Sequence, residues 1–306
     1  MAADALPAPP GSRRWRRFGR RRLAVASAVL ILLLVLAAAA APLVAAALAL
    51  DGATVDLFNR YAPSSAQNPL GTDELGRDLL VRLLDGGRIS LLVGVLGALG
   101  AALLGTAIGL VSGFAGGRLD AFLMRFTDGV IALPLLPLLI VLAAVDLAKL
   151  GVPAEIAYSE AASVWRIVVL LALFGWTTVA RLVRGQVLSL RQRDFVRAAR
   201  ALGAGPWRIM LAHILPNASS PIIVATTLSI GNLILTESIL SFLGLGIQPP
   251  VPSWGNMLTN AQELVWEAPR LAVLPGLLIF LTVIAFNLLG DGLQDALDPR
   301  AETRRT

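Results

Sequence analysis

FVRAARALGAGPWRIMLAHILPN, residues 195–217, is a long polar and basic insertion late in an otherwise apolar chain. Its pattern predicts two short helices: Asp194 can cap the first, and Gly203 lies where a left-handed C-terminal cap is expected. Pro206 suits the first turn of the second helix, because the N–H that a proline lacks has no partner there. Pro216 is expected to close that helix. A helical hairpin of this kind indicates a docking element for a soluble partner.

The composition around this insertion is that of an integral membrane protein. Hydrophobic residues make up 56% of the 306 residues, only 15% are charged, and the mean hydropathy is +0.74. Soluble domains are about 45–50% apolar and about 25% charged. With no Cys and one His, the chain has neither a disulfide nor a His-built metal site. The net charge of +6 is better explained by membrane topology than by nucleic-acid binding.

Apolar stretches long enough to span a membrane, which needs about 20 residues, divide the chain. The expected order is a basic tail (1–22), a first span (23–50), an outer segment (51–88), a core (89–290) with a basic inner loop (184–216), and a tail (291–306). The core spans are expected at 89–111, 122–145, 164–183, 221–247 and 271–289. An uncleaved first helix is favoured over a signal peptide, whose apolar region has only about 7–15 residues.

Basic residues are distributed unevenly between the two sides of this all-α arrangement. Of the 26 Lys and Arg residues, 19 fall in the N-tail, the inner loops and the C-tail, and 7 lie in or near the three outer segments. Cytoplasmic segments carry the excess of basic residues. Because six spans place both termini on one side, we expect both termini in the cytoplasm, together with 195–217.

The stretch LGTDELGRDLLVRLLDGG (70–87) predicts an amphipathic helix lying at the outer membrane interface. Thr72 is its expected N-cap, and Gly86-Gly87 its expected end. Two charge pairs spaced i, i+4 lie on its polar face: Asp73–Arg77 and Asp78–Arg82. These charges indicate a solvated face rather than a catalytic acid pair.

Small residues and prolines predict how the spans pack. A small residue recurs at every fourth position of the second span and beyond it, which lets another helix approach closely; these are Gly97, Ala101, Gly105, Gly109 and Gly113. Pro134 and Pro137 predict a kink in the third span. Trp254 and Trp266 are expected to anchor the outer membrane interface.

Polar residues within the spans are candidates for a transport pathway or for structural contacts. The four are Asp128, Asn232, Glu237 and Asn287. Asp128 lies near an inner end, where a cap or an interfacial contact is an equal alternative. Glu237 lies deep in its span, where an acid suggests proton or substrate coupling, although it can equally form a hydrogen bond with a neighbouring helix.

The sequence lacks the motifs of several function classes. It has no G-x-x-x-x-G-K-[ST] loop, so the chain lacks the phosphate cradle needed to bind ATP. His213 has no paired nucleophile, and enzyme activity is not expected. The remaining classes are a transporter subunit driven from outside, a self-sufficient secondary transporter and a channel. The two halves of the sequence show no internal repeat, which disfavours a self-sufficient secondary transporter. A channel would leave the helical hairpin unexplained.

The insertion resembles the EAA loop of permeases from importing ABC transporters, through Ala198-Ala199, Gly203 and Leu215-Pro216. Three further blocks are similar to the C-type permease of the dipeptide/oligopeptide/nickel group: LGTDELGRDLLVRLLDGGRISLLVG (70–94), LSFLGLGIQPPVPSWGNML (240–258) and NLLGDGLQDALDPR (287–300). The similarity covers about residues 23–300. The sequence departs from the pattern at Arg197, where the family has Glu, and at His213, where the general motif has an apolar residue.

The resemblance implies a type I ABC importer permease fold with six transmembrane helices and a cytoplasmic coupling hairpin that docks in a groove of an ATPase subunit. The coupling residues it implies are Phe195, Arg197, Ala198, Ala199, Gly203, His213, Leu215, Pro216 and Asn217. It also implies the partners: a related B-type permease, two ATP-binding subunits that hold the ATP and Mg, and an extracytoplasmic solute-binding protein. No cofactor, metal or nucleic acid is expected on this chain.

The implied function is to form half of a peptide pathway in the bacterial inner membrane and to import di- or oligopeptides by alternating access. A permease for nickel or another small solute is the alternative within the family. Outside it, a stand-alone proton-coupled transporter would depend on Glu237 or Asp128.

Overall fold

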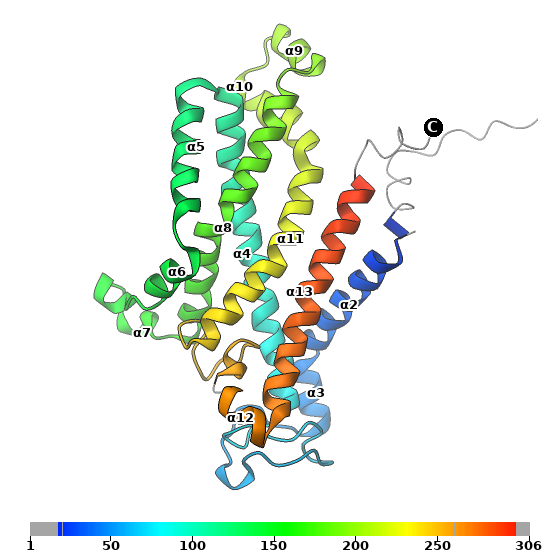
Figure 1. Cartoon of the computed structure of the whole chain (residues 1–306), viewed down its shortest axis with the longest axis vertical. Helices are drawn as coiled ribbons and strands as arrows, with labels where there is room; N and C mark the ends of the chain where they lie inside the picture. Colours follow the sequence, from blue (N-terminus) through cyan, green and yellow to red (C-terminus); the bar gives the residue numbers. More distant parts are fainter. Residues whose placement is uncertain (1–17, 20, 260, 298–306) are drawn as a thin grey trace, which may run out of the picture.

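A computed structural model of the chain describes residues 18–19, 21–259 and 261–297. The basic tail predicted over 1–22 and the tail predicted over 291–306 therefore lie largely outside the described residues. The described part is helical, and its long helices run along the long axis of the molecule (Figure 1). Its β-structure is limited to an isolated bridge between Thr72 and Asp78.

Five helices in the described residues are long and apolar enough to cross a membrane. They are α2 (Arg22–Ala39), α4 (Leu79–Ala115), α8 (Glu160–Leu190), α11 (Leu215–Phe242), which continues a helical run from Pro206, and α13 (Pro269–Leu297). The pair α5 (Gly117–Ala132) and α6 (Leu135–Ala143), bent by 82°, makes a sixth crossing when counted as one span. The expected all-helical membrane architecture is confirmed.

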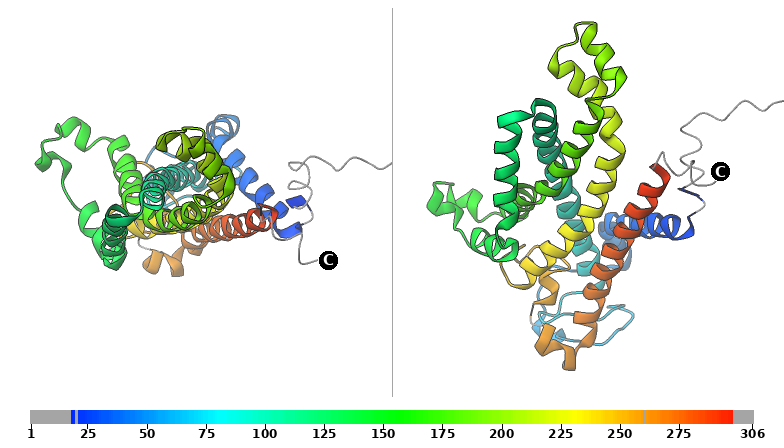
Figure 2. Two further views of the ribbon diagram at one scale, coloured as in Figure 1. Left: turned by 90° about the horizontal axis from the view of Figure 1, so that it is seen from above. Right: turned by 45° about the horizontal axis from the view of Figure 1, so that its top comes forward.

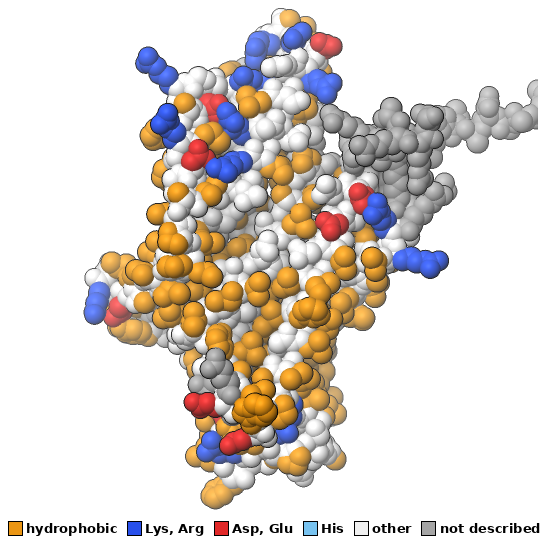
Figure 3. Space-filling model, viewed as in Figure 1, with side chains coloured by type: hydrophobic (Ala, Val, Ile, Leu, Met, Phe, Trp, Pro, Cys, Tyr) orange, Lys and Arg blue, Asp and Glu red, His pale blue; other side chains and the backbone are white. Residues whose placement is uncertain are grey.

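Shorter helices occupy the ends and connections. These are α3 (Ala41–Leu48), η1 (Leu57–Asn59), η2 (Leu147–Leu150), α7 (Ala154–Ala157), α9 (Asp194–Ala201), α10 (Pro206–Arg208), η3 (Ile209–Ile214), η4 (Asn256–Leu258) and α12 (Ala261–Glu267). Figure 3 shows hydrophobic side chains over the middle of one face, with Lys and Arg gathered mainly towards its two ends. This distribution is the one expected of a chain with an apolar band inside a bilayer.

The predicted kink of the third span is a complete break between α5 and α6. Leu133 is extended, with φ −72° and ψ 137°, as the residue before a proline prefers. Pro134 is extended as well and stands at the N-cap position of α6. Because Pro134 carries no N–H to continue the helical ladder, the chain turns here instead of bending gently.

Helices α4 and α8 form the centre of the bundle, and the small-residue seam of α4 lies between them. A Cβ added at Gly109 would lie 2.6 Å from the carbonyl oxygen of Ala180, and one at Gly113 would lie 2.7 Å from Cβ of Val187. The seam predicted from the sequence is confirmed, and its partner is α8.

The two chain ends pack together beside this centre. Seen end-on, α2 and α13 lie on one side of the bundle and α5 on the other (Figure 2). Arg21 forms an ion pair of 2.6 Å with Asp295, and Gly292 of α13 faces Ala24 of α2. The start of α2 and the end of α13 lie towards the same end of the molecule as α9 and α10 (Figure 1).

The prediction of a separate amphipathic helix within the stretch 70–87 is wrong. Gly76 has a φ of +77°, so the chain turns there, and the helix begins only at Leu79. Its N-cap is Asp78, whose carboxylate accepts a hydrogen bond of 2.9 Å from the Val81 N–H. Gly86-Gly87 does not end the helix, which continues unbroken into the α4 span.

Trp254 explains these two glycines and was itself wrongly assigned to the membrane interface. The side chain is 2% exposed, and its Nε1 donates to the Leu83 carbonyl at 2.9 Å. A Cβ at Gly87 would lie 2.9 Å from the indole ring, so the glycine allows the ring to approach α4. Trp266, by contrast, is 88% exposed.

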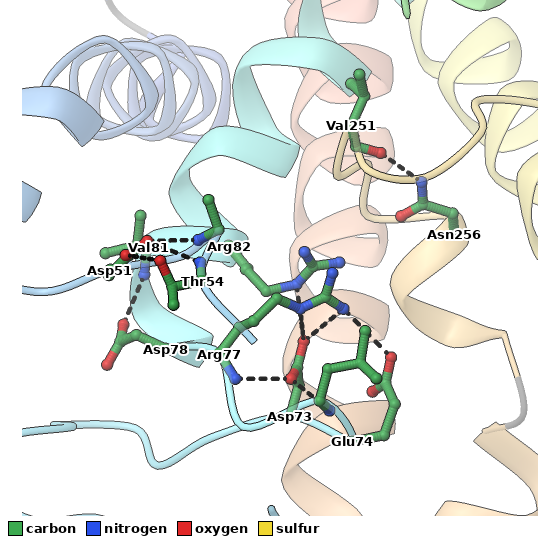
Figure 4. A network of polar contacts seen from close by, with 12 residues as sticks. Asp51, Thr54, Asp73, Glu74, Arg77, Asp78, Val81, Arg82, Val251 and Asn256 are labelled. Atoms are coloured by element: carbon green, nitrogen blue, oxygen red, sulfur yellow. Dashed lines mark hydrogen bonds and ion pairs between the residues drawn. The ribbon is translucent and has the colours of Figure 1, made fainter. Parts of the chain in front are cut away.

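The four charges predicted to form a solvated face, Asp73, Arg77, Asp78 and Arg82, are buried instead; Figure 4 shows their contacts. Arg77 contacts the Asp73 carboxylate at 2.8 Å through both Nε and Nη2, and Arg82 Nε lies 3.1 Å from the same oxygen. The expected Asp73–Arg77 pair is therefore present, whereas Arg82 pairs with Asp73 instead of Asp78. A buried carboxylate held by two guanidinium groups keeps its charge compensated and orders this segment.

Candidate functional site

The hairpin predicted over 195–217 forms one tip of the molecule, beyond the ends of α8 and α11 (Figure 1). Gly203 has a φ of +82°, the Ala204 N–H donates to the Ala199 carbonyl, and the Gly203 N–H donates to the Arg200 carbonyl, both at 3.0 Å. These two bonds form a Schellman C-cap, as predicted. Arg193, rather than Asp194, occupies the N-cap position of α9, and Asp194 lies in the first turn, where its charge favours the helix dipole.

The second arm of the hairpin continues directly into a membrane span. Pro206 begins α10, as predicted. Pro216 does not close the helix, because α10 passes through the π-helical turn η3 into α11. A wider π turn accommodates the missing N–H of a proline just after it without ending the helical path. Motion of the hairpin is thus carried directly by α11.

The inner face of the hairpin is part of an apolar cluster shared with the spans. Val196 and Ile214 are completely buried and pack in one cluster with Val183 and Val187 of α8. Ala199 is 8% exposed, so its small side chain lies on the buried side of the hairpin. The hairpin is therefore firmly attached to α8 as well as to α11.

The outer face of the hairpin exposes large apolar side chains that the sequence reasoning did not single out, apart from Phe195. The exposed fractions are Phe195 40%, Leu202 89%, Trp207 67% and Leu211 54%. Their spacing in the sequence could have identified them. Phe195 and Leu202 are spaced i, i+7, and Trp207 and Leu211 are spaced i, i+4, on an otherwise polar loop. Several large apolar side chains exposed on one polar loop are typical of a protein-interaction site; we call these four residues the outer apolar set.

The other predicted loop residues surround this set or support it. Arg197, Ala198, Gly203, Pro216 and Asn217 are exposed, whereas His213 and Leu215 are half-buried. Arg197 contacts Asp194 at 3.8 Å, a loose pair that leaves its guanidinium 71% exposed. Asn217 Nδ2 donates to the His213 carbonyl at 2.7 Å. Arg197, standing where the family has an acid, is thus directed to the surface and does not support the fold of the hairpin.

Ion pairs attach α5 to the helix that carries the hairpin. Arg184 of α8 holds Asp120 of α5 with two contacts of 2.6 and 2.7 Å, and Arg181 pairs with Asp128. Of the two roles considered for Asp128, the structure supports a contact between helices. At the end of α8, Arg191 Nη1 donates to the Gly113 carbonyl of α4 at 2.9 Å. Movement of α8 is therefore transmitted to α4 and α5.

Glu237 lies in a completely buried network of serine hydroxyls. Its carboxylate accepts hydrogen bonds from Ser241 at 2.7 Å and from Ser90 of α4 at 3.2 Å. Ser241 in turn accepts from the Ile247 N–H at 3.0 Å, and Ser90 from the Trp254 N–H at 3.1 Å. The predicted hydrogen bond to a neighbouring helix is confirmed, and Glu237 holds the outer segment 247–254 onto α4 and α11.

The four polar residues predicted within the spans do not form one constellation. Asp128 has its partner on α8 and Glu237 on α4, while Asn232 is exposed and Asn287 is half-buried. Glu237 therefore has a structural contact that is independent of the other three.

We expect Glu237→Gln to retain transport within about twofold, because the amide oxygen still accepts from serine hydroxyls on one side and a serine hydroxyl on the other side can rotate to accept from the amide N–H. Glu237→Ala should lower the amount of folded protein strongly, since it leaves several buried hydroxyls unpaired at about 1–3 kcal/mol each. Uptake and thermal unfolding in detergent measure both effects. Proton coupling through this residue would instead make the glutamine variant inactive while it remains fully folded.

The helical spans and the exposed hairpin fit one class of protein: a multi-pass membrane permease subunit of a transport system. Residues 105–303 match the family described as binding-protein-dependent transport system inner membrane component, and residues 10–69 match the N-terminal transmembrane domain of oligopeptide transport permease C. The chain belongs to the family of binding-protein-dependent transport system inner membrane components.

Named relatives are similar over most of their length. The glutathione transport system permease protein of Pectobacterium atrosepticum is 42% identical over 94% of this chain and 91% of its own. The oligopeptide permease protein of Bacillus subtilis is 40% identical over 82% of this chain and 77% of its own. The di/tripeptide permease protein of Pseudomonas aeruginosa is 43% identical over 76% and 72%, respectively.

Proposed function

We propose that the chain is the transmembrane permease subunit of an ATP-driven importer of di- and oligopeptides in the bacterial cytoplasmic membrane. The observation that carries this proposal is the two-sided hairpin. Its outer apolar set is available to a partner, while its inner face is buried against α8 and its second arm is continuous with α11. A push on the hairpin therefore moves two spans as one body.

The energy comes from separate partners, because this sequence lacks a phosphate-binding loop. Two ATP-binding subunits hold ATP and Mg and dock on the hairpins, and this chain has no catalytic role. ATP can drive transport only if it binds with different affinity to the inward-facing and outward-facing arrangements. The chain forms half of the pathway, and a related B-type permease forms the other half.

Peptides are the substrate class that the relatives support. Their names specify glutathione, di- and tripeptides and oligopeptides, which all carry a peptide backbone with charged ends. An extracytoplasmic solute-binding protein delivers the peptide at the outer face. Both termini face the cytoplasm, in agreement with the excess of Lys and Arg on that side and with the position of the helix ends towards the hairpin.

The test is reconstitution in proteoliposomes with the B-type permease, both ATP-binding subunits and the binding protein. We expect uptake of a labelled dipeptide that requires ATP and every component. Uptake by this chain alone, without the ATP-binding subunits, would contradict the proposal. Uptake of nickel but not of peptides by the complete system would retain the transporter class and overturn the substrate.

A further inference from the structure

A polar cavity of about 230 Å³ lies at the outer start of α8, away from the hairpin, and it is bordered by part of the outer segment that the Glu237 network holds. Its walls come from segments distant in the sequence: Leu147 and Ala157–Ser159 before α8, Glu160–Arg166 on its first turns, and Gln248–Pro250 after α11. Drug-sized ligands occupy pockets of about 300–1,000 Å³. This cavity is smaller, so it suits one end of an extended molecule.

Arg166 is the cation of this cavity, and it has no partner in the described part of the chain. Its Nε is buried without a hydrogen bond, and no carboxylate of the described residues forms an ion pair with the guanidinium. Glu160 also lines the cavity, but it does not pair with Arg166. The two Nη atoms are accessible and form no hydrogen bond with a described residue, so they are the donors that a ligand in the cavity can reach.

The cavity wall is held in place independently of Arg166. Tyr158 donates its hydroxyl hydrogen bond to Asp146, at 3.1 Å from either carboxylate oxygen, and Ser159 caps α8 by accepting from the Ala162 N–H at 3.2 Å. The Tyr158–Asp146 bond satisfies that carboxylate without using Arg166. The guanidinium therefore remains available in a preformed site.

We propose that the Arg166 cavity binds the C-terminal carboxylate of a short peptide entering from the outer face. A guanidinium binds a carboxylate through two parallel hydrogen bonds, which suits a planar carboxylate better than any neutral group. This inference rests on the proposed peptide function and adds a substrate contact on this chain. It gives the permease a means of recognising the free end of a peptide after release from the binding protein.

The absence of cysteine from the chain allows a direct test with a single Ala162→Cys substitution, since Ala162 lines the cavity and is half-buried. The complete transporter, in vesicles, is treated with thiosulfonate reagents carrying either a negative or a positive charge. We expect the ratio of anionic to cationic modification rates to fall about tenfold on adding Arg166→Gln, as expected for loss of a nearby charge. Arg166→Lys should retain part of the ratio.

The matched control is Arg88→Gln, because Arg88 lies near the outer end of α4 with its side chain 54% exposed and pairs with Asp85. This control should leave the ratio unchanged. A dipeptide with a free C-terminus should protect the Ala162→Cys thiol, whereas its C-terminal amide should not. An unchanged reagent ratio in Arg166→Gln, or equal protection by acid and amide, would overturn the inference.

Two further measurements distinguish a failure of this inference from a failure of the proposed function. Protection that requires the peptide-free binding protein would assign the carboxylate to that protein and overturn the peptide assignment. Dipeptide uptake is measured on the unsubstituted transporter, because Ala162 itself lines the proposed site. Absence of dipeptide uptake would count against the proposed function itself. Normal uptake, together with a reagent ratio that Arg166→Gln does not change, would count against this inference alone.

Discussion

ATP-driven peptide uptake should fall about tenfold or more when Gly203 is replaced by valine, while the chain still inserts and folds. Gly203 has a φ of +82°, and an added Cβ would meet no atom of the chain within 4 Å. The internal cost is therefore backbone strain of about 1–3 kcal/mol at the cap, and the new side chain projects from the hairpin towards the docking partner. We expect ATP hydrolysis to lose its dependence on the loaded binding protein.

Gly117→Val is the matched control for this variant. Gly117 also has a positive φ, +58°, and no atom within 4 Å of an added Cβ, but it is the first residue of α5, outside the hairpin. Strain alone would affect both variants equally. Coupled uptake and stimulated ATP hydrolysis should be lost only in Gly203→Val, and equal losses would contradict a docking role for the hairpin.

Folding itself should be sensitive to substitution at the glycine seam of α4. In Gly109→Ala the new Cβ would lie 2.6 Å from the Ala180 carbonyl oxygen and 2.7 Å from Cβ of Val183. Backbone atoms of α8 cannot move aside locally, so the two central helices must separate. Overpacking of this kind costs about 1–3 kcal/mol, and we expect a lower thermal unfolding temperature in detergent and less protein in the membrane.

Gly185→Ala on the facing helix should behave in the opposite way. An added Cβ at Gly185 meets no atom within 4 Å, and alanine favours a helix by up to about 1 kcal/mol over glycine. Its unfolding temperature should stay unchanged or rise slightly. If both alanine variants unfold at the same temperature, the seam is not the tight contact between α4 and α8 that the structure shows.

The outer segment shows where local sequence rules fail. Thr72 to Gly87 has the periodicity and charge spacing of an amphipathic helix, yet only the part from Leu79 onward is helical. Gly76 adopts a left-handed conformation because the segment folds back over the start of α4, and Asp73, before that turn, binds Arg77 and Arg82, which both follow it. The spacing of charges cannot distinguish a solvated helix face from a buried ion cluster, because burial depends on what covers it.

The hairpin was predicted correctly as an element, but only some of its features could be predicted from the sequence. The glycine cap and the proline start were predictable, since each depends on the backbone preferences of one residue. The outer apolar set was not singled out, apart from Phe195. Which apolar residues face outward depends on the packing of Val196 and Ile214 against α8, and that packing involves residues of a different helix.

By itself, the sequence determined the membrane class, the positions of the apolar spans, the small-residue seam and the hairpin, because composition, periodicity and single-residue backbone preferences act locally. Only the tertiary structure decided how distant residues pair: Ser90 with Glu237, 147 positions apart, Asp120 with Arg184, 64 apart, and the Arg166 cavity between α8 and the segment after α11. These contacts depend on which helices lie side by side. The apolar sequence of a span does not specify which other span it packs against, because attraction between apolar faces has no direction. The neighbour of each span is therefore determined by how the shapes fit and by a few polar pairs.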